Sequence, residues 1–205
     1  MICPEWISAG SDAITALAAI AASGAAAFGI TSWRRELTGR AEFDAARGLI
    51  RATYKLRNAI ADCRSPFISA QEFPADYHGF LGKHSVEQEA AAWGQVYRGR
   101  WTSVQDALQE FDTQTLEAES LWGDAMRSRA IAMRKCVQTI FVAIESFVAD
   151  KASGGENFRA NREFGESVRR DLSASTSDAD NPLSLRIDSA IQELESLVLP
   201  HLRHM

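Results

Sequence analysis

The sequence predicts an all-α protein: an N-terminal transmembrane helix that continues into an antiparallel four- or five-helix bundle with coiled-coil-like seams. Three observations carry this prediction. Residues 13–33 contain no charged side chain. Four later segments place apolar residues at alternating spacings of four and three, which is typical of a helix with one buried face. No segment alternates apolar and polar residues in the manner of a half-buried β-strand.

The uncharged segment is long enough to cross a bilayer. A helix rises ~1.5 Å per residue, so residues 13–33 cover about 30 Å, the thickness of a membrane core. The residues that follow suit the membrane interface, because an aromatic side chain and basic side chains anchor a span there. We expect this interface at Trp33, Arg34, Arg35 and Arg40. Since Lys and Arg stay on the cytoplasmic side, residues 1–12 form a short outer tail and residues 34–205 form the cytoplasmic domain.

Two other interpretations of this segment stay open, because nine of its residues are alanine, which is only weakly apolar. One is a cleaved export signal, although the residues before it are acidic rather than basic. The other is a helix buried inside a wholly soluble helical domain. Small residues four apart let helices approach closely in lipid, but an alanine-rich helix also contains them by chance. Two series have this spacing, Ala18, Ala22 and Ala26 and also Ala21, Ala25 and Gly29. On this basis we expect homo-oligomer packing in the membrane through Ala18, Ala22, Ala26 and Gly29.

Charge is distributed unevenly along the chain, whose net charge is −5. Residues 34–64 carry eight Lys or Arg and four acidic residues, whereas the chain from residue 65 onward is acidic. Phosphate contacts need a basic face, so nucleic acid is not an expected partner. The basic stretch fits a role near the lipid bilayer, where anionic head groups attract Lys and Arg.

The domain after the membrane segment is predicted to be built from four long helices. Each has a seam of apolar residues, and in the first the basic residues Arg47, Arg51 and Lys55 point away from that seam. The four seams are Ala46, Leu49, Thr53, Leu56, Ile60 and Cys63; Ala90, Trp93, Tyr97, Trp101, Val104, Leu108 and Phe111; Met126, Ala130, Met133, Val137, Ile140, Ile144 and Phe147; and Leu183, Ile187, Ala190, Leu194 and Leu197.

Breaks between these helices follow from turn-forming residues. Pro66 ends the first helix, and residues 64–84 are expected to form a loop. Ser85 with Gln88 three residues later is typical of a capping box at the start of the next helix. The DTQT stretch at 112–115 predicts a weak break, and residues 153–155 a stronger one. The composition of residues 173–182 predicts a flexible linker.

No catalytic or cofactor motif is found in the sequence. It has no Gly-rich phosphate loop after a strand, no HExxH, no CxxC and no GxSxG. Three scattered cysteines indicate neither a disulfide framework nor a zinc site. Glu-x-x-His pairs of the di-iron bundle type are missing. We therefore expect no enzyme activity, no cofactor and no metal; a metal-dependent bundle enzyme would need clustered inward-facing ligands.

Aromatic residues suggest a surface for an unknown protein partner. Most of the five tryptophans should be core. A loop rich in Phe and Pro that packs near them would form a groove, and aromatic anchors are enriched at interfaces. The residues of this predicted partner surface are Pro66, Phe67, Trp93, Tyr97 and Trp101.

The same stretches carry a resemblance to a family. WRRELTGRAEFDAARGLIRATYKLRNAI, RSPFI, YRGRW, LEAESLWG and LVLPHLR together resemble a family of uncharacterised bacterial proteins with one N-terminal membrane helix and a helical cytoplasmic domain. The matching pieces cover residues 33–68, 97–123 and 197–203. The resemblance implies anchorage in the bacterial inner membrane and implies no activity.

These observations predict a membrane-anchored, single-pass helical protein that serves as a protein-interaction or assembly module. One alternative is an oligomerising membrane effector of the defence or stress type, which the close-packing small residues motivate. The other is the wholly soluble helical domain with a buried alanine-rich helix.

Overall fold

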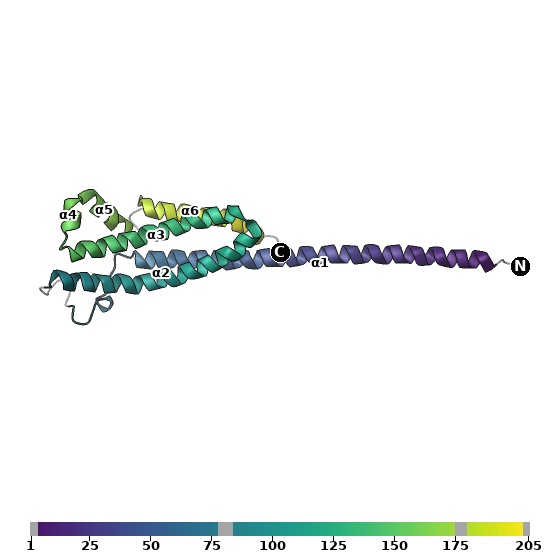
Figure 1. Ribbon diagram of the computed structural model, residues 1–205, viewed down its shortest axis with the longest axis horizontal. Helices are drawn as coiled ribbons and strands as arrows, with labels where there is room; N and C mark the ends of the chain where they lie inside the picture. Colours follow the sequence, from purple (N-terminus) through teal and green to yellow (C-terminus); the bar gives the residue numbers. More distant parts are fainter. Residues whose placement is uncertain (1–3, 78–83, 175–179, 203–205) are drawn as a thin grey trace. The chain divides into compact units, whose positions relative to one another are not determined.

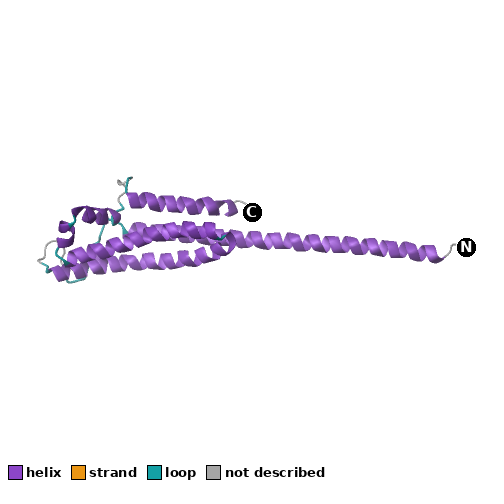
Figure 2. Cartoon of the chain, turned by 45° about the horizontal axis from the view of Figure 1, so that its top comes forward, coloured by secondary structure: helices purple, strands orange, loops and turns teal. Residues whose placement is uncertain are grey.

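The computed structural model describes residues 4–77, 84–174 and 180–202. These residues contain helices and no strand, so the predicted all-α class is confirmed. Figures 1 and 2 show the helices and the loops between them. The elements are α1 (Pro4–Cys63), the short 3₁₀ helix η1 (Ala70–Glu72), α2 (Val86–Trp122), α3 (Asp124–Ala152), α4 (Glu156–Ala160), α5 (Arg162–Asp171) and α6 (Pro182–Leu202).

The chain divides into two compact units, Met1–Asp44 and Ala45–Met205. In the first unit, the side chains from residue 21 to residue 41 are all exposed. They include large apolar groups at Phe28 and Trp33, which are 75% and 63% exposed. The side chains of residues 4–16 and 18–20, which include the first part of the predicted span at residues 13–16 and 18–20, lie outside the described residues. In the part of the chain that the structure describes, no helix combines the length and the apolar character needed to cross a membrane.

The second unit has one hydrophobic core, to which α1, α2, α3 and α6 all contribute. The seam predicted for the first helix is buried along its whole length, from Ala46 to Cys63. Within it, Thr53 satisfies its buried hydroxyl by donating to the carbonyl of Leu49, at 2.8 Å. The seams of α3 and α6 are buried in the same way, except that Phe147 and Leu197 at their ends are half-buried.

A single glycine joins α2 to α3. Gly123 has φ 61° and ψ −143°, a backbone conformation that residues with a Cβ rarely adopt. Its amide caps α2 by donating to the carbonyl of Glu119 at 2.8 Å. The chain can therefore reverse within one residue, and α2 and α3 lie side by side (Figures 1 and 2).

The break predicted at DTQT is wrong, because α2 runs through residues 112–115 without interruption. Thr113 and Thr115 donate their hydroxyls to carbonyls four residues earlier, at 2.9 and 2.7 Å, so neither competes with the helix. Thr115 is buried together with Phe111 and Ala118. The predicted capping box at Ser85 is confirmed, with both of its hydrogen bonds formed to and from Gln88.

The flexible linker predicted at 173–182 needs correction at its two ends, because both are fixed by Arg64. This arginine is 2% exposed and donates to the carbonyls of Asp171 at 2.7 Å and Ser173 at 3.0 Å. It also donates to Ser184 Oγ at 3.1 Å and Asn181 Oδ1 at 3.2 Å, at the start of α6. Residues 175–179 lie outside the described residues.

Candidate functional site

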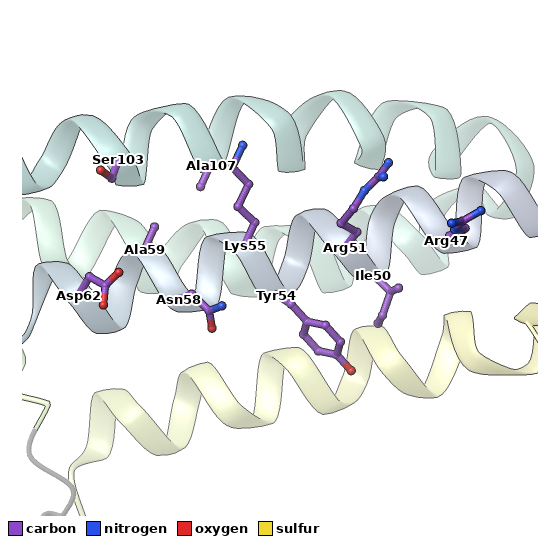
Figure 3. A pocket seen from close by; sticks show the side chains of 10 residues that line it. All are labelled: Arg47, Ile50, Arg51, Tyr54, Lys55, Asn58, Ala59, Asp62, Ser103 and Ala107. Atoms are coloured by element: carbon purple, nitrogen blue, oxygen red, sulfur yellow. The ribbon is translucent and has the colours of Figure 1, made fainter.

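The outward face of α1 in the second unit forms an open groove of about 700 Å³. Figure 3 shows α2 along one side of α1 and α6 along the other. Ten side chains line the groove, eight from α1 and two from α2: Arg47, Ile50, Arg51, Tyr54, Lys55, Asn58, Ala59, Asp62, Ser103 and Ala107. The eight are centred on the side of α1 opposite its buried seam, as expected for a helix with a period of 3.6 residues, although Ala59 at the edge of this set is buried in the core.

Three cations follow one another at every fourth residue of α1, at Arg47, Arg51 and Lys55. All three are exposed, and Figure 3 shows Arg51 and Lys55 directed toward α2. The Lys55 ammonium donates to Glu110 Oε2 of α2 at 2.5 Å. This hydrogen bond lowers the pKa of the Glu110 carboxyl. Lys55 is thus already paired within the chain, whereas the two arginines form no ion pair among the described residues.

The apolar part of the groove comes from the other edge of the same helix face. Ile50 and Tyr54 are half-buried and point toward α6 (Figure 3). The Tyr54 hydroxyl donates to Glu195 Oε1 of α6 at 2.7 Å, and this hydrogen bond together with burial raises the pKa of the tyrosine. The tie holds the ring in place, so the groove keeps its apolar surface without needing a ligand to order it.

A second exposed feature is the loop from Arg64 to Tyr77, which Arg100 of α2 holds in shape. The Arg100 guanidinium donates to the carbonyls of Ser65 and Phe67 at 2.7 and 2.6 Å and to both carboxylate oxygens of Glu72. Its hydrogen bond to Glu72 is the main cause of the lowered pKa of that carboxyl. Arginine suits this role because its guanidinium group carries five N–H donors in a fixed geometry, so one side chain can hold several loop acceptors. Phe67 is left 89% exposed on a fixed backbone.

The residues of the predicted partner surface are not all on one surface. Pro66 and Phe67 are exposed, but Tyr97 is only 7% exposed and packs against Phe147 with ring centroids 5.6 Å apart. The interpretation of Tyr97 as a surface residue is therefore wrong. Trp93 and Trp101 are half-buried and contact Phe147 and Phe141, so these aromatics strengthen the contact between α2 and α3.

The residues predicted for the membrane segment lie on the first unit. Trp33, Arg34, Arg35 and Arg40 are all exposed, and Arg40 pairs with Glu36 one turn earlier at 2.6 Å. Ala22, Ala26 and Gly29 are exposed too, and no atom lies within 4 Å of a Cβ placed on Gly29. The side chain of Ala18 lies outside the described residues.

Sequence reasoning missed the roles of Arg64 and Arg100. From the sequence, both residues contribute only to the charge balance. Each lies beside an apolar seam, where a guanidinium group needs hydrogen-bond acceptors. Glu72 lies three residues after Ser69, so a capping box there could have indicated an ordered loop; the structure contains it. In the described ranges, no three His, Cys, Asp or Glu side chains come together as a metal site.

Comparison with known proteins returns no match: no protein-family model, no curated protein and no solved structure matches this chain.

Proposed function

We propose that this chain is a membrane-anchored helical protein that works as a protein-interaction or assembly module without catalysis of its own. In this proposal residues 13–33 span the bacterial inner membrane once, with the N-terminus outside. The second unit is an antiparallel helical bundle with coiled-coil-like seams in the cytoplasm. Its groove on α1 and its loop around Phe67 are the surfaces offered to another protein or to a second copy of the chain.

The observation that carries the anchor is the distribution of exposed apolar side chains on α1. At 100° per residue, Leu17 and Phe28 lie on one side of the helix, while Ile30 and Trp33 lie on the opposite side. All four are between 56% and 75% exposed. A helix that rests on a membrane surface, or pairs with a single partner, has one apolar stripe. Apolar side chains on opposite sides of a helix are all removed from water only when an apolar medium surrounds the helix, as the hydrocarbon core of a bilayer does.

The basic residues support the orientation. Arg34 and Arg35 directly follow Trp33, and all three are exposed. Interfacial tryptophan followed by arginine is the arrangement expected where a span leaves the membrane on its cytoplasmic side.

Fractionation of the full chain tests the anchor. Bacterial membranes containing the chain would be washed with alkaline carbonate, which strips peripheral proteins and leaves spanning ones. We expect the wild-type chain to stay in the pellet. Ala22→Lys with Ala26→Lys places two cations near the middle of the span at about 3 kcal/mol each, so this variant should move to the supernatant.

The matched control is Ala22→Leu with Ala26→Leu, which changes the same two exposed positions and keeps the segment apolar. This control should remain in the pellet. A wild-type chain that the wash removes completely would refute the anchor and would favour the soluble alternative.

A further inference from the structure

We propose that the groove on α1 binds an acidic amphipathic helix of a partner protein. This inference rests on the proposed role as an interaction module, but it does not depend on the membrane anchor. Its basis is the pairing of two features in one groove: a row of cations and a strip of apolar and small side chains.

The charge of the groove is opposite to that of the chain. The whole chain carries a net charge of −5, yet the lining contains Arg47, Arg51 and Lys55 and one acidic residue, Asp62. Lys55 pairs with Glu110, and Arg51 also helps to lower the pKa of that carboxyl, but neither Arg47 nor Arg51 forms an ion pair among the described residues, so both keep donors for an incoming group. Guanidinium groups pair with carboxylates through parallel hydrogen bonds, and this favours Asp or Glu on the partner.

The spacing of these donors matches a helix. Arg47 and Arg51 are one turn apart, or roughly 6 Å along the axis of α1. Carboxylates at positions i and i+4 of a partner helix that runs beside α1 have the same separation. From Arg47 to Asp62 the groove extends along roughly 22 Å of α1, enough for about four turns of a second helix.

The rest of the lining can accept the apolar face of that helix. Ile50 and Tyr54 supply apolar surface, and Tyr54 is held in place by its hydrogen bond to Glu195. Ser103 is small and exposed, so a bulky side chain such as leucine has room beside it, above the buried Ala59 and Ala107. An amphipathic helix that lies in a groove uses anchors at i, i+3, i+4 and i+7, a pattern that suits this strip.

Asp62 makes the two ends of the groove differ in charge. The cations lie toward one end and Asp62 lies at the other, so a partner helix with acidic residues at one end and a basic residue at the other fits in one direction only. The α1 helix of a second copy is a poorer match, because it would bring its own three cations to this groove.

The test uses the purified full chain in detergent and two fluorescein-labelled helical peptides of about 18 residues, enough to fill the groove. Both peptides carry leucine at i, i+3, i+4 and i+7. One carries Glu, and the other Lys, at two flanking positions four residues apart. Fluorescence anisotropy should show the Glu peptide binding at least about tenfold more tightly than the Lys peptide, as expected for two charge pairs.

Three variants locate the binding. Arg47→Glu with Arg51→Glu should reverse the preference between the two peptides. Ser103→Trp, at an exposed lining position on α2, should block both peptides by filling the groove. The matched control, Arg98→Glu with Arg162→Glu, changes two exposed arginines outside the groove by the same charge and should keep the wild-type preference. Thermal melting followed by circular dichroism identifies any variant that does not fold. The comparison of the two peptides on the wild-type chain tests the inference without any variant.

Equal binding of the Glu and Lys peptides to the wild-type chain would overturn the inference. So would binding that persists unchanged in Ser103→Trp, since it would place the peptide elsewhere. If Ser103→Trp instead converts an oligomer to a monomer in light scattering, the occupant is a second copy, and the inference is again overturned. If the chain resists the alkaline wash but binds the two peptides equally, the membrane anchor is supported and the inference about the groove is overturned.

Discussion

Replacement of Arg64 by methionine should destabilise the second unit strongly. The guanidinium is buried and makes four hydrogen bonds, all to uncharged acceptors on α5, α6 and the segment between them. Burial lowers the pKa of this arginine, which shows that the folded state bears a cost for keeping the charge inside. Methionine keeps most of the aliphatic length and removes the donors.

The size of the effect follows from which acceptors lose their only described donor. The Ser173 carbonyl still accepts from Asn181 Nδ2, and Asn181 Oδ1 still accepts from two backbone amides. The Asp171 carbonyl and Ser184 Oγ lose the donor that Arg64 provides. Both residues are half-buried, and an acceptor left unpaired there costs about 1–3 kcal/mol when water does not reach it; the relief of the buried charge offsets part of this. We expect a net loss of about 3 kcal/mol in the free energy of unfolding.

Urea unfolding followed by circular dichroism measures this loss, as a lower midpoint at an unchanged slope. Arg57→Met is the control, because Arg57 is exposed and, among the described residues, hydrogen-bonds its neighbour Asn58 and lies 4.8 Å from the Tyr54 ring; it should change stability by less than about 1 kcal/mol. If Arg64→Met is as mild as Arg57→Met, the reasoning that this arginine fixes the start of α6 is refuted.

Three further outcomes are expected. Gly123→Ala should cost about 1–3 kcal/mol in urea unfolding because alanine resists φ 61°, whereas Gly99→Ala, in an exposed helical position with no atom within 4 Å, should stabilise by about 0.5–1 kcal/mol; equal effects would contradict the backbone explanation. Burial raises the pKa of Cys63 to about 11 from 9.0, so its stabilising contribution is complete below pH 9 and is lost as the pH rises to about 11; the fall in stability over this window should be smaller in Cys63→Ala, and an identical fall would count against it. Arg100→Gln should make the loop of residues 64–77 a site of limited proteolysis while the protease sites elsewhere keep their resistance, and a loop as resistant as that of the wild type would show that the clamp is dispensable.

The helices and their buried faces could be predicted from the sequence, because hydrophobic periodicity depends only on the spacing of residues along one segment. The seam from Ala46 to Cys63 and the capping box at Ser85 are of this kind. The continuity of α2 through DTQT could not be foreseen in the same way, since it depends on Thr115 finding both an apolar environment and a carbonyl acceptor. Tertiary packing overrode a weak local signal there.

Only part of the candidate groove could be predicted from the sequence. Its cations were recognised as the outward face of a helix, but that face becomes a groove only because α2 and α6 lie on either side of it. The side chains that tie those helices to α1, Glu110 and Glu195, are far away in the sequence. A single sequence has no signal for such pairs. The same holds for Arg64, whose acceptors lie more than a hundred residues later.

That distance has a consequence for the order in which the protein is made. Arg64 and Asn181 are separated by 117 positions, and Tyr54 and Glu195 by 141. At about 5–20 residues per second, a ribosome needs roughly 6–25 seconds to bring Asn181 out after Arg64. The α2–α3 pair, joined through one residue, can form during that interval from local contacts alone. The contacts of α1 with α6, such as the hydrogen bond from Tyr54 to Glu195, form only after α6 has been made, so during synthesis the residues of α1 that α6 contacts stay uncovered.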